Sequence, residues 1–315
     1  MPVLPAAVSP AVVSRLALTN AVANGVIVIT GGAVRLTGSG LGCPTWPRCT
    51  EDSFVATEEL AVHGVIEFGN RTLTGVLTAA AIAVVVAVFR SSRRDLRPLA
   101  LWSFLGIPAQ ALLGGVTVLT GLNPWIVAAH FLLSAVLVAV ATTLWLRSRE
   151  PGVGRPLLRR PFELLVTGIA AVTAAVLVLG TVVTGSGPHS GDLDEEAGVT
   201  TVDRMGFDPE LVSQLHADVV FLLLGLTVAL LVALYATDSP GRVRRAARDL
   251  LVVQLAQGVV GYVQFFTDLP IALVLLHMLG AVLITAYTAR LVWSVRGPAS
   301  ELPLTSSTEP ATATR

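Results

Sequence analysis

The sequence contains no lysine and few charged residues of any kind. Charged residues make up 13% of the 315 residues, about half of the quarter that is usual in soluble proteins. All 21 basic side chains are arginine, and 21 acidic side chains balance them. So little charge cannot cover a soluble domain of this size, and the neutral balance offers no chain-wide basic patch for nucleic acid.

Cysteine is similarly scarce, with Cys43 and Cys49 as its two instances. Two cysteines are too few for a disulfide-dense secreted module or for a four-cysteine metal site. The sequence Cys-x-x-Cys-His does not occur, which excludes covalent attachment of a c-type heme.

Hydrophobic residues are abundant, at 53% of the chain, and the mean hydropathy is +0.75. Eight membrane helices of ~20 residues would need ~160 apolar residues, which is close to this supply. The sequence therefore predicts an all-α integral membrane protein with eight transmembrane helices. The hydrophobic runs lie near residues 16–35, 64–89, 99–119, 125–146, 162–184, 210–236, 250–266 and 271–294.

Arginine is concentrated in three of the predicted loops, 90–98, 147–161 and 237–249, whereas the alternate loops are acidic. Because cytoplasmic loops retain arginine, we expect both termini in the cytoplasm and both cysteines on the outer side of a bacterial cell membrane. The Ser/Thr/Pro-rich residues 297–315 are predicted to form a disordered cytoplasmic tail.

An internal repeat is visible at an offset of 147 residues. It predicts two four-helix bundles with the same membrane orientation, residues 1–150 and 151–296. Repeats of this kind occur in transporters and in cofactor-binding bundles, so the polar residues must decide between them. The repeated features are Thr37-Gly-Ser-Gly40 and Thr184-Gly-Ser-Gly187, Ala109-Gln110 and Ala256-Gln257, and His130 and His277.

Three histidines lie inside the predicted helices: His130, His216 and His277. Each follows a proline at the outer end of its helix by six or seven residues, which places the imidazoles about 10 Å below the outer surface. Matched depth suits a planar heme whose iron takes histidines from two sides. The alternatives are helix-packing histidines bonded to polar neighbours and a zinc site, which lacks accompanying carboxylate or thiol ligands at a convincing spacing.

Polar residues also share one face of the second predicted helix: His63, Glu67, Asn70 and Arg71. A carboxylate and a guanidinium in the membrane are costly unless they face a cavity or each other. Glu67 and Arg71 therefore form either a structural ion pair or part of a substrate site. Arg35, at the outer end of the first helix, is a candidate for holding an anionic group such as a propionate, or for anchoring the membrane interface.

The outer loop contains Gly42-Cys43-Pro44-Thr45-Trp46-Pro47-Arg48-Cys49. The outer side of a cell membrane is oxidising, so we expect a disulfide between the two cysteines. It is either a structural staple or a redox-active pair, since an exposed and strained disulfide is easily reduced.

These motifs together resemble the heme A synthase family. The resemblance rests on the loop from Gly40 to Cys49, on Ile66-Glu67-x-x-Asn70-Arg71, and on the histidines of the fourth, sixth and eighth helices. It covers most of residues 16–294. It implies oxidation of the C8 methyl group of heme O to a formyl group, which gives heme A for cytochrome oxidase.

The same resemblance assigns roles to the two halves. It implies a heme b cofactor bound by His216 and His277 in the C-terminal half. It implies a heme O site near His130 in the N-terminal half, with Glu67 as the catalytic carboxylate. The partners it implies are heme O synthase, cytochrome oxidase assembly proteins and membrane lipid; a homo-oligomer is a further possibility.

The sequence departs from the family pattern in two places. Asn70 stands where the family usually has histidine, so either His130 binds the substrate iron alone or His63 supplies the missing ligand. The loop before the sixth helix lacks the second cysteine pair of many family members, which argues against a mechanism that needs both pairs.

Two rival functions share some of these features. A non-catalytic diheme cytochrome b linked to quinone would use the histidines but would explain neither Glu67 nor the cysteine loop. A transporter would use the repeat, but the sequence lacks the pair of Gly/Pro-broken helices that transporter sites often contain.

Overall fold

The computed structural model describes residues 8–150, 154–189, 191–192 and 202–297. Eight long helices, two short 3₁₀ helices and one two-stranded sheet make up its regular structure. The long helices are α1 (Pro10–Leu36), α2 (Ala61–Phe89), α3 (Arg97–Leu119), α4 (Pro124–Ser148), α5 (Arg160–Ser186), α6 (Pro209–Ala236), α7 (Gly241–Phe266) and α8 (Ile271–Ser294); the short elements are η1 (Glu58–Leu60), η2 (Arg94–Leu96), β1 (Arg155–Pro156) and β2 (Arg296–Gly297).

All eight long helices are long and apolar enough to cross a membrane, which confirms the predicted all-α membrane fold. Two helix starts were predicted wrongly. Helix α1 begins at Pro10, capped by Ser9, and α7 begins at Gly241, so residues 241–249 are helical and not part of a loop. Hydropathy marks the apolar part of a helix, whereas backbone hydrogen bonding continues through polar turns beyond it.

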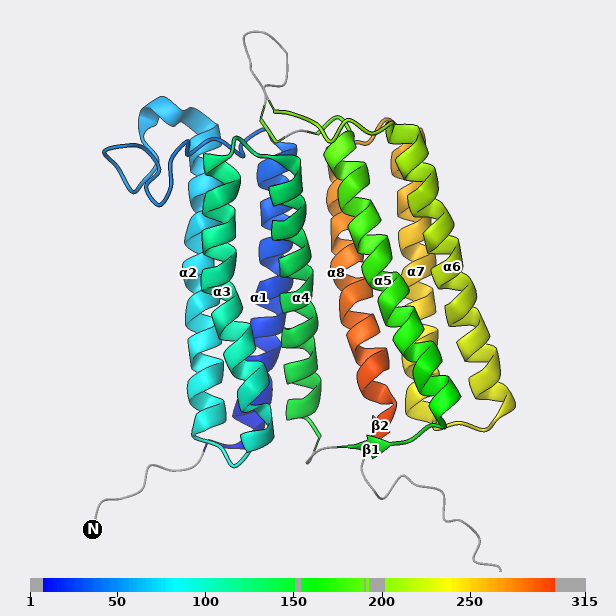
Figure 1. The fold of residues 1–315 in the computed structure, drawn as a ribbon. Helices are drawn as coiled ribbons and strands as arrows, with labels where there is room; N and C mark the ends of the chain where they lie inside the picture. The colour runs from blue at the N-terminus through cyan, green and yellow to red at the C-terminus, as the bar shows by residue number, and fades with distance from the viewer. Residues whose placement is uncertain (1–7, 151–153, 190, 193–201, 298–315) are drawn as a thin grey trace, which may run out of the picture.

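The helices form two four-helix bundles that stand side by side, α1–α4 and α5–α8 (Figure 1). Within each bundle, consecutive helices pack together and the last helix packs on the first. Helices α2 and α4 are therefore diagonal partners in the first bundle, and α6 and α8 are diagonal partners in the second. The bundles meet through α1 and α4 on one side and α5 and α8 on the other.

Small residues let α1 approach α8 closely. A Cβ atom at Gly32 would lie 2.4 Å from Sδ of Met278, and one at Gly25 would lie 3.2 Å from Cγ1 of Val282. Close backbone approach at glycine is the usual way in which membrane helices gain packing energy. The interface thus depends on the absence of side chains at these two positions.

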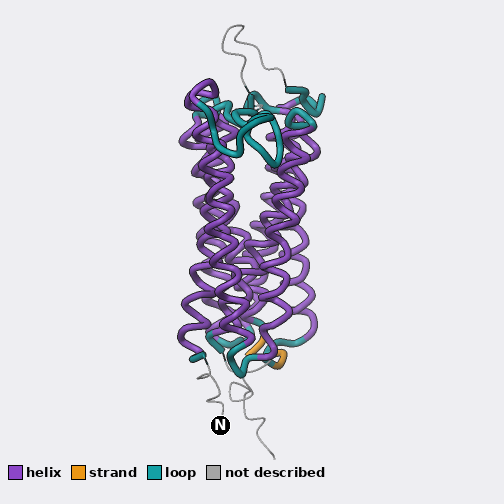
Figure 2. Tube along the Cα trace, turned by 90° about the vertical axis from the view of Figure 1, so that its left-hand side faces the viewer, coloured by secondary structure: helices purple, strands orange, loops and turns teal. Residues whose placement is uncertain are grey.

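The two ends of the molecule differ in their loops. The segment before α2, residues 37–57, is called the Cys loop below; it lies at one end, and the described ends of the chain lie at the other (Figure 1). Figure 2 shows loops gathered at the first end and the strands β1 and β2 at the second. The predicted tail lies outside the described residues except for Gly297, and membrane sidedness stays a prediction from the arginines.

Glu150 joins the two bundles at the end away from the Cys loop. Its Oε1 accepts a hydrogen bond from Arg242 (2.9 Å) and its Oε2 accepts one from Trp293 Nε1 (3.0 Å). Because Glu150 follows α4 and both donors belong to the second bundle, we expect Glu150→Ala to destabilise the protein by about 1 kcal/mol. Unfolding of the detergent-solubilised variant would measure this loss.

Arg248→Gln is the matched control for Glu150→Ala. Its guanidinium pairs with Asp249 (2.8 Å) within one helix, and its side chain is 57% exposed. We expect no measurable change in stability from this variant, because exposed ion pairs contribute little. Equal losses from the two variants would contradict a special role for Glu150.

Candidate heme site

Two histidines lie on diagonal helices of the second bundle. His216 is on α6 and His277 is on α8, and these two helices are diagonal partners in the bundle. Each ring packs against a glycine: a Cβ at Gly180 would lie 3.3 Å from Cε1 of His216, and one at Gly261 would lie 3.2 Å from Cε1 of His277. The glycines make room for the rings inside the bundle.

His130 occupies a matching position on α4 of the first bundle. A Cβ at Gly114 would lie 3.1 Å from its Cε1. The carbonyl oxygen of His130 accepts a hydrogen bond from Gln110 (3.1 Å), just as that of His277 accepts one from Gln257 (2.8 Å). Helices α3 and α4 thus repeat the contacts of α7 and α8 around a histidine.

Asn70 lies on α2, the diagonal partner of α4. Its Oδ1 accepts a hydrogen bond from the hydroxyl of Thr30 on α1 (2.7 Å). A Cβ at Gly31 would lie 3.9 Å from the Nδ2 of Asn70. The first bundle therefore presents one histidine and one asparagine from diagonal helices, whereas the second presents two histidines.

The three helical histidines have the environment of ligands. The Nδ1 atoms of His130 and His277 are buried and make no hydrogen bond with any described residue. An unpaired polar atom in a protein interior is costly and needs an explanation. Imidazoles on diagonal helices, with glycines beside them, suit the coordination of a heme iron, so these residues fit a heme.

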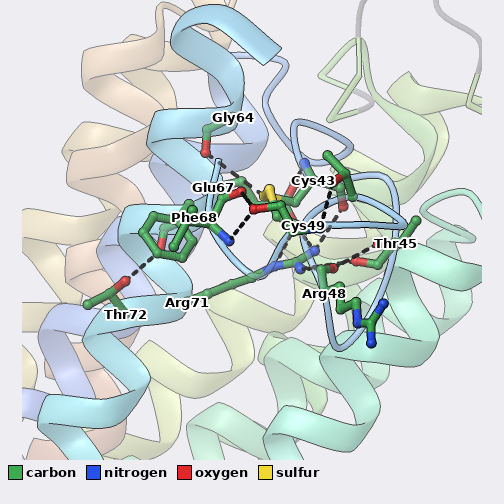
Figure 3. The surroundings of a disulfide bond; sticks show 12 residues. Cys43, Thr45, Arg48, Cys49, Gly64, Glu67, Phe68, Arg71 and Thr72 are labelled. Carbon is green, nitrogen blue, oxygen red and sulfur yellow. Dashed lines mark hydrogen bonds and ion pairs between the residues drawn. A yellow bond between two sulfur atoms is a disulfide. The ribbon is translucent and has the colours of Figure 1, made fainter. Parts of the chain in front are cut away.

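The ion pair predicted on the second helix is present and holds the Cys loop (Figure 3). Glu67 is 5% exposed. Its Oε1 accepts hydrogen bonds from Nε (3.0 Å) and Nη2 (2.5 Å) of Arg71, and its Oε2 accepts one from the backbone N–H of Cys43 (2.6 Å). The carboxylate is therefore bonded both to its own helix and to the loop.

Arg71 completes this attachment. Its Nη1 donates to the carbonyl oxygens of Thr45 (3.0 Å) and Arg48 (3.1 Å), and its Nη2 donates to that of Cys43 (2.9 Å). One guanidinium thus holds three loop carbonyls as well as the carboxylate of Glu67, which is the forked geometry that arginine provides.

Trp46 carries the Cys loop into the first bundle. A Cβ at Gly115 would lie 2.5 Å from Cδ2 of the Trp46 indole, so the ring covers this glycine of α3. The neighbouring Gly114 contacts His130. The loop therefore reaches from the ion pair on α2 to within one residue of the glycine beside His130.

The predicted disulfide between Cys43 and Cys49 is present, with Cα atoms 4.4 Å apart. Both cysteines are 0% exposed, so the disulfide is buried and not exposed, and a redox role for it stays a prediction. The loop presses directly on α2, since a Cβ at Gly42 would lie 2.3 Å from the carbonyl oxygen of His63. This backbone contact buries the sulfur atoms.

Burial predicts how the disulfide responds to reagents. We expect a soluble trialkyl phosphine to leave it intact in the folded protein, because the sulfur atoms are inaccessible. Under denaturing conditions the same phosphine should expose two thiols to alkylation. Mass spectrometry of alkylated peptides would decide, and full alkylation of the folded protein after brief reduction would contradict a purely structural disulfide.

Two other predicted site residues make different contacts. Nδ1 of His63 lies 2.8 Å from the Ser39 hydroxyl, two helical turns from Asn70. Arg35 donates to the carbonyl oxygen of His189 from Nε (3.0 Å) and Nη2 (2.7 Å), and to that of Thr184 (3.2 Å). Arg35 thus joins α1 to the second bundle, and no described carboxylate pairs with it.

Sequence reasoning missed Thr30 and the roles of Trp46 and Gly180. A threonine within an apolar helix gives no signal until its partner is known. Trp46 belongs to the quoted loop motif, but its contact with α3 depends on tertiary structure. Gly114 and Gly261 were detectable, because they recur at the repeat offset beside His130 and His277.

A family model described as cytochrome oxidase assembly protein (COX15-CtaA) matches residues 14–289. The chain belongs to this family. The match includes all eight long helices at least in part, together with the Cys loop and the three helical histidines.

This member of the cytochrome oxidase assembly protein family is also similar to proteins named heme A synthase. The protein from Listeria welshimeri is 34% identical over 117 residues, which is 36% of this chain and 38% of the relative. That from Halalkalibacterium halodurans is 29% identical over 161 residues (49% and 53%). That from Bacillus pumilus is 37% identical over 125 residues (38% and 39%). The aligned stretches thus span two fifths to about half of these relatives.

Proposed function

We propose that this protein is a heme A synthase, an oxidoreductase that converts the C8 methyl group of heme O to the formyl group of heme A. The diagonal pair of His216 and His277, beside a second bundle with one matching histidine, is the observation that carries the proposal. Family membership and the names of the relatives support it.

The C-terminal bundle is the proposed cofactor half. His216 and His277 would hold a heme b through their imidazoles, since the two side chains come from diagonal helices and each ring has a glycine beside it. Bound there, heme b would supply electron transfer. The protein's part is to fix both imidazoles in an apolar bundle, whose buried core, including Ile169 and Leu223, lies toward the end away from the Cys loop.

The N-terminal bundle is the proposed substrate half. His130 would bind the iron of heme O, and Asn70 would face it from α2. With water as the source of the oxygen atom, conversion of a methyl group to a formyl group passes electrons to an acceptor and releases protons at one carbon, so a nearby proton-accepting group is required. Glu67 is one turn from Asn70 on the same face of α2, and we propose that it accepts these protons.

Arg71 and the Cys loop would position this carboxylate. Three hydrogen bonds fix the two oxygens of Glu67, and the loop covers the same end of the bundle. We propose that this end faces outward from a bacterial cell membrane. Arg35 remains a proposed contact for a propionate, which would have to compete with the carbonyl oxygens that now accept its hydrogen bonds. Heme O synthase and cytochrome oxidase assembly proteins are the proposed partners.

The hemes extracted from the purified protein test this function. Incubation with heme O and an electron acceptor should yield heme A, with heme B also present as the retained cofactor, when extracts are separated by chromatography. Heme B as the sole bound heme, with heme O recovered unchanged, would instead support a diheme cytochrome b. That alternative is disfavoured because all three helical histidines lie near the Cys-loop end, whereas electron transfer across a membrane usually needs hemes at both faces.

A further inference from the structure

The two bundles offer four comparable positions for an axial ligand, and one of them differs. Three positions hold a histidine packed beside a glycine of the preceding helix, at His130, His216 and His277. The fourth, on α2, holds Asn70. We propose that the N-terminal bundle binds its heme iron through His130 alone, and that Asn70, oriented by Thr30, leaves the opposite iron position open to a small diatomic ligand. This inference rests on the proposed heme binding in that bundle.

The depth of Asn70 supports its place opposite His130. Two consecutive residues of the Cys loop reach both sides of the bundle: Thr45 accepts a hydrogen bond from Arg71 on α2, and Trp46 covers Gly115 on α3. Asn70 lies nine residues after the start of α2 and His130 six residues after the start of α4, so their depths below the Cys-loop end differ by about one helical turn.

The chemistry of Asn70 excludes it as a strong axial ligand. Protein hemes are held by imidazole, thiolate, thioether or phenolate groups, and a neutral amide is none of these. Oδ1 is turned toward α1, because it accepts the hydrogen bond from Thr30 (2.7 Å). Because Oδ1 faces Thr30, the Nδ2 atom points to the other side of the amide group. No described residue accepts a hydrogen bond from Nδ2. Asn70 is thus a positioned hydrogen-bond donor.

His63 does not supply the missing iron ligand in this arrangement. It lies seven residues before Asn70, about 10 Å along the helix, and its Nδ1 is within hydrogen-bonding distance of the Ser39 hydroxyl. Its backbone is pressed against Gly42 of the Cys loop. Moving His63 to the depth of His130 would require breaking the packing that holds this loop.

Carbon monoxide binding tests the open position directly. The full-length protein, loaded with hemin to two hemes per chain and reduced with dithionite, should bind carbon monoxide at one heme. Asn70→His should abolish this binding and convert the high-spin ferric signal in electron paramagnetic resonance to a low-spin one. His216→Ala is the positive control, because it should open the second bundle to carbon monoxide as well.

A second measurement separates the hydrogen bond from the open position. Thr30→Val should keep carbon monoxide binding but raise the infrared C–O stretching frequency, since Asn70 loses its fixed orientation. Asn70→Ala should also raise the C–O stretching frequency, because it removes the hydrogen-bond donor.

Three results would overturn the inference: no carbon monoxide binding to the wild-type protein, binding of one heme in total, or unchanged binding in Asn70→His. Recovery of binding in His63→Ala after a negative wild-type result would identify His63 as the ligand. The proposed function has a separate test, because heme A formation without carbon monoxide binding would retain the function and reject the open position. Carbon monoxide binding without heme A formation would retain the open iron position and reject the proposed function.

Discussion

Replacing His277 with alanine is expected to remove the low-spin heme b spectrum of the purified protein. One imidazole cannot complete a bis-histidine site, and alanine offers no ligand atom in place of the imidazole of His277. His216→Ala should give the same loss, because we propose that the two histidines hold the same iron from diagonal helices. Absorbance and electron paramagnetic resonance spectra of the reduced and oxidised proteins would measure this change.

His130→Ala is the matched control for these two variants. It removes a histidine of the same depth and surroundings, beside Gly114 and Gln110, but in the other bundle. We expect it to leave the low-spin spectrum intact while weakening binding of the second heme. An unchanged spectrum in both His216→Ala and His277→Ala would remove the assignment of heme b to the C-terminal bundle.

The histidines show how much of the site could be predicted from the sequence. Their helices could be located because membrane spans are long apolar runs, and their matched depth followed from the prolines at the helix starts. The diagonal pairing of α6 with α8 could not be derived, because it depends on how four helices pack around one another. The contacts of the glycines with the histidine rings also depend on this packing and could not be predicted.

The Cys loop shows which properties of the site could not be predicted from the sequence. The pairing of its cysteines was predictable from their oxidising compartment and short spacing, but their burial was not. Burial arises from contacts between segments: Gly42 against the backbone of α2, Arg71 beneath three loop carbonyls, and Trp46 against α3. Hydropathy patterns contain no information about such contacts, so the burial of the disulfide could not be derived from the sequence.

The Glu67–Arg71 pair leaves two roles for Glu67 that a pair of substitutions can separate. The carboxylate either accepts protons from the substrate or serves as the anchor of the Cys loop. Its hydrogen bonds to Arg71 and to the N–H of Cys43 are consistent with both roles. Glu67→Gln removes the charge and proton-accepting capacity while preserving an oxygen that can accept from Cys43. Arg71→Gln removes the same ion pair and the contacts to the loop carbonyls while preserving the carboxylate.

We expect Glu67→Gln to lower the rate of heme A formation by about 10²–10⁴-fold, the range typical of losing a general acid or base. Heme b should remain bound, and heme O or its hydroxylated form should accumulate in extracts. Arg71→Gln should cost less activity but should expose the loop, which limited proteolysis and Trp46 fluorescence would report. If Arg71→Gln loses as much activity as Glu67→Gln and both expose the loop equally, then the carboxylate acts by holding the loop. A large loss of activity in Glu67→Gln, with the Cys loop still protected from proteolysis, would instead place Glu67 in the chemistry. Movement of Trp46 away from Gly115 could not then explain the lost activity.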